Sequence, residues 1–141
     1  MDADPRATAL LDYWHASVRQ GGIPDRDAFD PFNLRQWLGL LSIYEPVAGT
    51  LDFRNRLDGT GITDLTGEDW TNGLASEIDA RYGTSLKQDL QTAHAAQGPV
   101  IHRIAIFQKN FTSAIRLLLP VSSREEGDPS QVFLAIFVDK P

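Results

Sequence analysis

The chain has 141 residues, the usual length of one domain, and this is enough to bury a hydrophobic core without disulfides or metals. Hydrophobic residues make up 42% of it, a share that excludes a chain disordered throughout. It carries 13 Lys and Arg against 19 Asp and Glu, a net charge of −6. Proteins that bind phosphate backbones or anionic membranes through charge are basic, so we expect neither a nucleic-acid partner nor a membrane partner.

Cysteine is absent from the sequence. Its absence excludes disulfides, catalytic thiolates, Cys-ligated zinc and flavin photochemistry that forms a cysteine adduct. Residues 1–5 are acidic where a secretion signal needs basic residues, and the longest apolar runs, 117–121 and 132–138, are too short to span a bilayer. We therefore expect a cytoplasmic protein.

A helix is predicted near the N-terminus, because Asp4 can cap it and Pro5 occupies the favoured first position. Its apolar residues recur every three or four positions and form one stripe: Ala7, Leu10, Leu11, Trp14 and Val18. Gly21 and Gly22 are expected to end the helix. The stripe needs a surface to pack on, either the chain's own sheet or a second copy, and we expect a homodimer through this helix.

Two strands and a helical segment are predicted next, after a connector rich in Pro and Asp. The strands cover residues 39–47 and 52–57. The second strand alternates in polarity, and one of its faces consists of Phe53, Asn55 and Leu57. Glycines break residues 59–73 into short helical turns.

A longer helix and three further strands complete the predicted elements. Ser85 and Gln88 have the spacing of a capping box and are expected to begin the helix, which Gly98 ends. The strands are rich in β-branched and aromatic residues and cover 100–109, 111–121 and 131–139. An exposed loop is expected over residues 122–130.

The order of these elements predicts an α+β fold. Five strands, with helices before and between them, favour one antiparallel sheet with helices on one face and an extra N-terminal helix. We divide the chain into residues 1–35, a helix and connector that act as a cap or dimerisation segment, and residues 36–141, the core.

Two groups of residues resemble a known family. The first includes the run 11–14, Arg19, Gly21, Pro24, Arg26 and the turn 29–31 with Leu34 and Leu38; the second comprises residues 52–60 and 65–69. Both are similar to motifs of a bacterial PAS-like family, once catalogued as a domain of unknown function and later assigned to the PAS superfamily. The resemblance rests on motifs over residues 10–75 and on element order over 76–139. It implies a small bacterial protein with one five-stranded PAS-like domain, no attached catalytic domain and no known catalytic residues.

No motif in the sequence predicts a metal or nucleotide site. Gly59 and Gly61 begin like a dinucleotide-binding loop, but Asp64 stands where the third glycine would be, so we interpret them as turn and helix-entry residues. The neighbouring acidic residues are interpreted as helix caps and solvated loop residues. Three histidines without cysteine and without ligand spacing do not indicate zinc. His94 is the exception of interest, because haem-binding PAS sensors take their proximal ligand from the corresponding helix.

The sequence thus predicts a sensory or signalling module without catalytic output, which binds a small hydrophobic ligand, a signalling partner, or both. The candidate residues of the pocket wall are Leu57, Ile104, Ile106, Leu117, Leu119 and Phe133. Because the chain ends directly after the last predicted strand, we expect the signal to pass to a separate protein through a shift of the N-terminal helix; a piece of a longer protein would end in the same way.

Three alternatives remain open at this stage. The chain could be an interaction domain that binds no small molecule. It could be a haem sensor that uses His94. It could also be a small cavity enzyme, with Asp52 or Glu45 acting beside Tyr44, although charged and turn residues flank both carboxylates.

Overall fold

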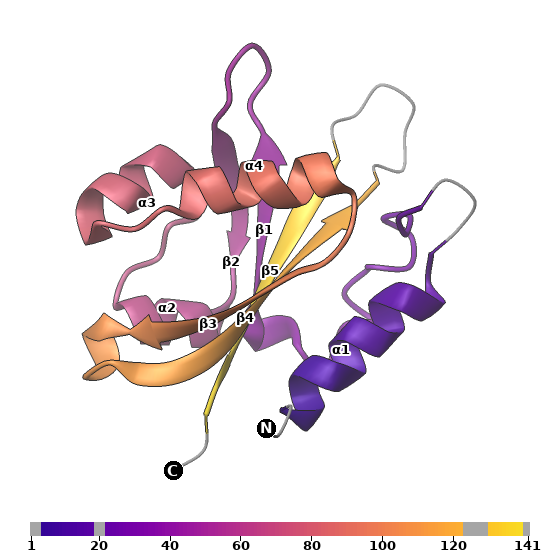
Figure 1. Cartoon of the computed structure of the whole chain (residues 1–141), viewed down its shortest axis with the longest axis horizontal. Coiled ribbons are helices and arrows are strands. Elements are labelled where there is room, and N and C mark those ends of the chain that lie inside the picture. Colours follow the sequence, from indigo (N-terminus) through magenta and orange to yellow (C-terminus); the bar gives the residue numbers. More distant parts are fainter. Residues whose placement is uncertain (1–3, 19–21, 123–129, 140–141) are drawn as a thin grey trace.

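A computed structural model describes residues 4–18, 22–122 and 130–139 of the chain (Figure 1). The described residues form the helices α1 (Pro5–Ala16), α2 (Thr60–Thr66), α3 (Ala75–Tyr82) and α4 (Leu86–Ala96). They also form the strands β1 (Leu41–Pro46), β2 (Phe53–Asp58), β3 (Val100–Ile106), β4 (Thr112–Val121) and β5 (Gln131–Val138), with 3₁₀ turns η1 (Leu38–Leu40) and η2 (Phe107–Lys109). Three features of the sequence analysis lie outside the described residues: Arg19, the expected helix stop at Gly21, and residues 123–129 of the expected loop.

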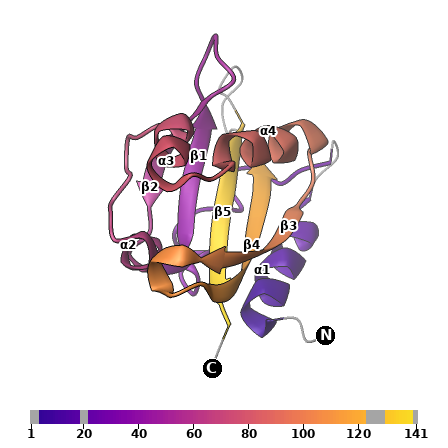
Figure 2. The same ribbon diagram turned by 60° about the vertical axis from the view of Figure 1, so that its left-hand side comes forward.

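The strands form one antiparallel sheet in the order β2-β1-β5-β4-β3. The first and last strands therefore pair at its centre, with Leu41 opposite Ala135. Helices α2, α3 and α4 cover one face of the sheet, whereas α1 crosses the other face (Figures 1 and 2). The five predicted strands are all present, and the extra N-terminal helix shares its face of the sheet with the connector that follows it, whose Phe29, Leu34 and Trp37 are buried in the same core.

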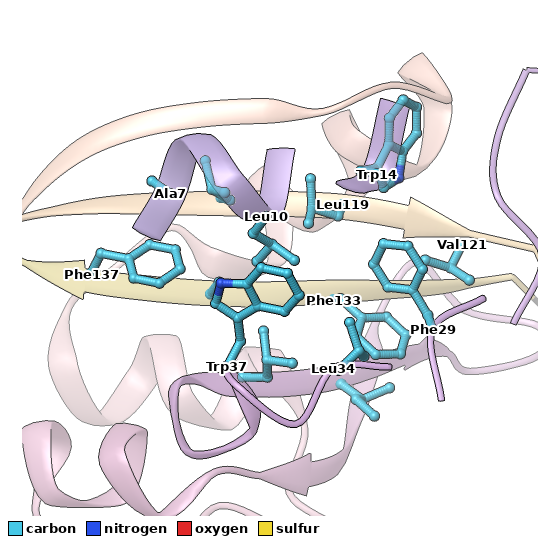
Figure 3. Close-up of a cluster of buried hydrophobic side chains, with 14 of the residues drawn as sticks. Ala7, Leu10, Trp14, Phe29, Leu34, Trp37, Leu119, Val121, Phe133 and Phe137 are labelled. Carbon is cyan, nitrogen blue, oxygen red and sulfur yellow. The ribbon is translucent and has the colours of Figure 1, made fainter. Parts of the chain in front are cut away.

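Alternate residues of the central strands build two separate cores. Leu117 and Leu119 of β4 pack toward α1, while Leu118 packs toward α4 and the other helices. The α1 side of β5 contributes Phe133, which meets the Phe29 ring edge-on at 5.3 Å between centroids (Figure 3). Both faces of β4 and β5 are apolar because both are covered, which explains the unbroken apolar runs in their sequences.

The apolar stripe of α1 packs on the chain's own sheet. Ala7, Leu10 and Trp14 are buried there, and the Trp14 indole Nε1 donates to the Pro120 carbonyl at 2.9 Å. The helix ends at Ala16, earlier than predicted. Ser17 is the C-cap residue, and its hydroxyl and backbone N–H both donate to the Tyr13 carbonyl.

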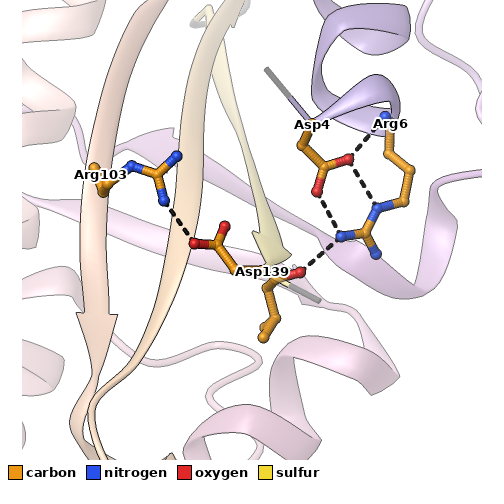
Figure 4. A network of polar contacts seen from close by, with 5 residues as sticks. Asp4, Arg6, Arg103 and Asp139 are labelled. Carbon is orange, nitrogen blue, oxygen red and sulfur yellow. Dashed lines mark hydrogen bonds and ion pairs between the residues drawn. The ribbon is translucent and has the colours of Figure 1, made fainter. Parts of the chain in front are cut away.

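The start of α1 is capped as the sequence predicts. The Asp4 carboxylate accepts from the Arg6 backbone N–H at 2.9 Å, and Pro5 follows the cap. The Arg6 guanidinium returns to the Asp4 carboxylate at 2.6 Å and donates to the Val138 carbonyl at 2.8 Å, which ties α1 to the end of β5 (Figure 4). In the same view, Asp139 pairs with Arg103 of β3 at 2.8 Å.

Replacing Asp4 by alanine is expected to lower the free energy of unfolding by about 1 kcal/mol, because the cap and the Arg6 contact are lost together. Asp4→Asn is the matched control, since an asparagine side chain still caps and should restore most of the loss. Urea denaturation measures both variants. Equal stability of Asp4→Ala and the parent chain would contradict the capping role.

Two local predictions are wrong, and each has a physical reason. The predicted capping box of α4 does not form: Ser85 makes no side-chain cap bond. Asp79 of α3 caps the helix instead, accepting from the backbone N–H groups of Leu86 and Lys87 at 2.6 and 2.9 Å. The even alternation of β2 is also interrupted, because the register shifts between Ile43 and Tyr44.

The close approach of α2 to η1 explains the glycines that resemble a nucleotide loop. A Cβ atom on Gly59 would lie 2.5 Å from the Leu41 carbonyl oxygen, and one on Gly61 would lie 2.7 Å from the Gly39 carbonyl oxygen. Only glycine fits at either position, so packing accounts for both residues.

Within the described ranges, no helix has both the length and the apolar character needed to cross a membrane.

Candidate functional site

A cavity of about 270 Å³ lies between the sheet and the helices of its α2–α4 face. Its volume is close to the lower limit of about 300 Å³ that is usual for small-molecule pockets. The residues that line it come from β1, β2, β3, β4, β5 and all three helices: Tyr44, Asp58, Ile62, Leu65, Thr66, Trp70, Ile78, Tyr82, Thr84, Leu86, Ile104, Ala105, Ile106, Gln108, Arg116, Leu134 and Ile136.

Most of the cavity wall is apolar. Helices α2 and α3 present Ile62 and Ile78 to it from the helical side. The sheet contributes Leu134 and Ile136 from β5 and Ile104 from the edge strand β3. An apolar cavity of this kind holds water poorly and favours an apolar ligand.

Among the described residues, Asp58 at the end of β2 is the only Asp or Glu that lines the cavity. One of its oxygens accepts from the Ser42 hydroxyl at 2.6 Å, and the other accepts from the Trp70 backbone N–H at 3.1 Å. These two bonds hold the loop before α3 against β1 and β2. Asp58 is therefore a structural acceptor as well as a charged group beside the cavity.

Tyr44 brings a buried hydroxyl to the cavity. It is 4% exposed and accepts a hydrogen bond from the Asn55 side-chain amide at 3.2 Å. Burial raises the pKa of the Tyr44 hydroxyl far above its usual value, and the negative charge of Asp58 adds to the rise, while the Arg116 charge opposes it. The hydroxyl is thus protonated at neutral pH and available as a donor.

Arg116 of β4 is the cationic residue of the wall. Its guanidinium forms an ion pair with Asp89 of α4 at 2.6 Å and contacts His102 Nδ1 at 2.7 Å. Because the guanidinium only donates, Nδ1 of His102 accepts and carries no proton. The Nε of Arg116 is buried and has no hydrogen-bond partner among the described residues.

The six predicted wall residues divide between the two faces of the sheet. Ile104 and Ile106 line the cavity. Leu117, Leu119 and Phe133 do not; their side chains lie in the α1 core. The β3–β4 register places Ile104 opposite Ala114 and so puts even-numbered residues of both strands on the cavity face. The apolar run 117–119 carries no alternation from which this register could be predicted.

Leu57 also lies away from the cavity. The β2 bulge places it opposite Ile43, so it faces the α1 side, where it is 42% exposed. There it borders a second, smaller hollow of about 70 Å³, together with Leu38 and Phe133. The prediction placed Leu57 on the face of Phe53 and Asn55, which holds only for an unbulged strand.

Tyr44 lines the cavity, but the other residues of the alternative hypotheses, His94, Glu45 and Asp52, do not. His94 lies in the last turn of α4, with its ring 6.0 Å from the Phe53 ring. Glu45 accepts from the Gln131 amide at 2.7 Å. The Asp52 carboxylate accepts from the Ser76 hydroxyl and backbone N–H. Burial raises the pKa of Asp52, but these hydrogen bonds lower it more, so that the pKa lies below its usual value. Among the described residues, no cluster of His, Asp and Glu could hold a metal ion.

Sequence reasoning missed the helical side of the cavity. Ile62 and Leu65 of α2 share a helix face by their spacing, as do Ile78 and Tyr82 of α3. The spacing was visible in the sequence, but both helices are short and lie in a glycine-rich stretch. Tyr44 is predicted above as the partner of an enzyme carboxylate, and no sequence signal indicates Arg116 as a cavity residue.

A family comparison assigns this fold. The family model for the PAS domain matches residues 2–136, nearly the whole chain. The chain belongs to the PAS domain family. The predicted PAS family and the predicted α+β fold class are confirmed. Membership of this family makes the protein a sensory or interaction module in general terms. Neither a curated protein nor a solved structure matches this PAS chain.

Proposed function

We propose that this PAS domain is a sensory module that binds a small, mostly apolar ligand between its sheet and helices α2–α4, and that it regulates a partner without catalytic output of its own. The cavity of about 270 Å³ carries the proposal. The space is largely apolar and partly open to solvent, and a concave apolar surface with a few polar groups is typical of small-molecule sites.

Strands β4 and β5 provide a route for the signal. Leu134 lines the cavity, and its neighbour Phe133 packs in the α1 core on the opposite face. In the same way, Arg116 lines the cavity and Leu117 packs toward α1. A ligand that changes the twist of these two strands would move the surface on which α1 rests. Residues 1–35 are the cap that responds in this proposal, and residues 36–141 are the core that binds.

Self-association through α1 is a further part of the proposal. Because the apolar stripe of α1 packs on its own sheet, a homodimer would have to use the exposed side of the helix, which includes Thr8, Asp12 and His15. A signalling-protein partner could bind the same exposed side. The cytoplasmic location remains an expectation from the sequence.

A second candidate function, an interaction domain without a ligand, is favoured by the apolar surface beside the smaller hollow. Leu38 and Leu57 border this hollow and are 38% and 42% exposed, and Phe32, which follows the lining residue Pro31 in the sequence, is 70% exposed. Exposed large apolar side chains of this kind are typical of protein-binding surfaces.

The first test is native and denaturing mass spectrometry of the purified protein, together with its absorption spectrum. A native mass above the chain mass by that of a small molecule, or a visible absorption band, would support the sensory function and identify the ligand. A colourless protein without added mass, which also binds no apolar probe such as butylbenzene in calorimetric titration, would overturn ligand binding and leave the interaction domain. The native mass also reports the oligomeric state.

A further inference from the structure

The smaller hollow, on the α1 side of the sheet, is a second concave apolar surface. Strand β1 contributes Leu41 and Ile43 to its lining, β5 contributes Phe133, and the connector before β1 contributes Leu34. Its volume is about 70 Å³. Because a cavity of about 150 Å³ holds one benzene molecule, the hollow has room for one aliphatic side chain of about the size of leucine.

The border of the hollow is apolar and partly exposed. Leu38 and Leu57 line it and remain partly exposed, and Phe32 is exposed directly after the lining residue Pro31. At interface hot spots, one side chain of a partner enters a pocket, and contacts around the pocket exclude water. The hollow and its apolar border have this arrangement.

Arginines accompany this apolar surface. Among the described residues that line the hollow, Arg26 is the only charged one, and its guanidinium lies 5.2 Å from the centroid of the Phe133 ring. Arg35 is exposed and lies over the Phe32 ring at 4.4 Å. Within the described part of the chain, Arg35 forms no ion pair. Its charge is therefore available to a partner.

The carboxylates of this region already accept hydrogen bonds from the chain. Asp30 accepts from the Asn33 backbone N–H at 2.8 Å, and Glu45 accepts from the Gln131 amide at 2.7 Å. Arg56, which precedes Leu57, is half-exposed and approaches Glu45 only to 3.7 Å. Cationic groups thus surround an apolar hollow in a chain of net charge −6. The complement of such a surface is an acidic segment with an apolar anchor.

The hollow lies across the sheet from the ligand cavity. Strand β1 contributes Ile43 to the hollow and Tyr44 to the cavity, and β5 contributes Phe133 and Leu134 in the same way. Successive residues of a strand point to opposite faces of the sheet. A partner bound at the hollow therefore contacts two of the strands that also form the cavity wall.

We propose, on the basis of the regulatory function proposed above, that the hollow is the docking site for an acidic segment of a partner protein. The segment inserts one leucine-sized side chain into the hollow, and Arg35 and Arg56 bind the carboxylates beside this anchor. A protein partner is favoured over an anionic membrane, because such a membrane attracts basic proteins and this chain is acidic.

Three peptides with blocked ends test the anchor and the charge: Glu-Glu-Leu-Glu-Glu, Glu-Glu-Ala-Glu-Glu and Lys-Lys-Leu-Lys-Lys. In an NMR titration of the isotope-labelled full chain, the acidic leucine peptide is expected to shift the backbone amide signals of Leu38, Leu57 and Phe133. The alanine peptide is expected to bind about tenfold more weakly, since loss of roughly two buried methylenes accounts for that factor. The lysine peptide is expected to bind more weakly than the acidic leucine peptide, because it faces arginines.

Two variants with matched controls locate the site. Leu57→Ser and Arg35→Gln are each expected to raise the dissociation constant of the acidic leucine peptide about threefold or more, through the lost apolar contact and the lost ion pair. Leu51→Ser is the control for the first, because Leu51 is exposed between β1 and β2 and does not line the hollow. Arg81→Gln is the control for the second, because Arg81 is an exposed arginine of α3 that pairs with Glu68. Both controls should bind within twofold of the parent chain.

The outcomes separate this inference from the function on which it rests. If no peptide binds, if the leucine and alanine peptides bind equally, or if the lysine peptide binds best, the docking site is wrong, while butylbenzene binding still decides the sensory function. If the acidic leucine peptide binds as expected and butylbenzene does not bind, the docking site stands and the sensory function fails.

Two further measurements test other occupants of the hollow. Sedimentation of the chain with phosphatidylglycerol vesicles, if lost in Leu57→Ser, would assign the surface to lipid and overturn the proposal. A dimer in analytical ultracentrifugation that Leu57→Ser abolishes and Leu51→Ser preserves would assign the surface to a second copy and overturn it equally. Neither effect is expected.

Discussion

Replacing Trp14 by alanine is expected to lower the free energy of unfolding by about 3–5 kcal/mol, the usual range for a buried tryptophan. Trp14 is 3% exposed and lies in the core between α1 and the sheet. The substitution removes the largest side chain of the α1 stripe and leaves the Pro120 carbonyl without its indole donor. Urea denaturation, followed by circular dichroism, measures the change.

Two further variants identify the cause of this loss. Asp12→Ala lies on the exposed side of α1 and is expected to change the free energy of unfolding by no more than about 0.5 kcal/mol. Trp14→Phe keeps much of the packing and loses the hydrogen bond, so its stability should lie between those of the parent chain and Trp14→Ala. If Trp14→Ala were as stable as the parent but changed the oligomeric state, α1 would serve self-association rather than its own core.

The strands were predictable because their signals are local. Residues 131–138 combine β-branched and aromatic side chains, and the turn at Asn110, which adopts a left-handed conformation, separates β3 from β4 as expected. The cap of α1 is likewise a contact between neighbours, Asp4 and Arg6. The family motifs then supplied the sheet topology, which element order alone leaves open.

The composition of the cavity wall was much less predictable, because it depends on register. A one-residue change in register turns every side chain of a strand to the other face. The bulge in β2 has this effect on Leu57, and the β3–β4 pairing decides that Arg116, and not Leu117, faces the cavity. Neither the bulge nor the pairing leaves a local sequence signal. The cap of α4 was missed for a related reason, since Asp79 lies in the preceding helix.

The register has a functional consequence in this fold. Since β4 and β5 are covered on both sides, each contributes alternate residues to the ligand cavity and to the α1 core. A change in cavity occupancy and a change in α1 packing therefore act on the same two strands. Interior packing is dense enough to transmit such strain, so the cavity and the cap can be coupled without a separate hinge.

Ile104→Trp is expected to weaken the binding of an apolar probe such as butylbenzene tenfold or more, because loss of roughly two buried methylenes of ligand contact already accounts for that factor. Ile104 lines the cavity from the edge strand β3, where it is half-buried and faces the small Ala114. The larger ring fills space that is empty without ligand, so the free energy of unfolding should stay the same or rise by about 0.5–2 kcal/mol.

Ile101→Trp is the matched control, since Ile101 is 55% exposed on the other face of the same strand. Calorimetric titration and urea denaturation of both variants separate occlusion from unfolding. Unchanged binding in Ile104→Trp would place the ligand outside this cavity, and equal weakening in Ile101→Trp would trace the effect to β3 as a whole.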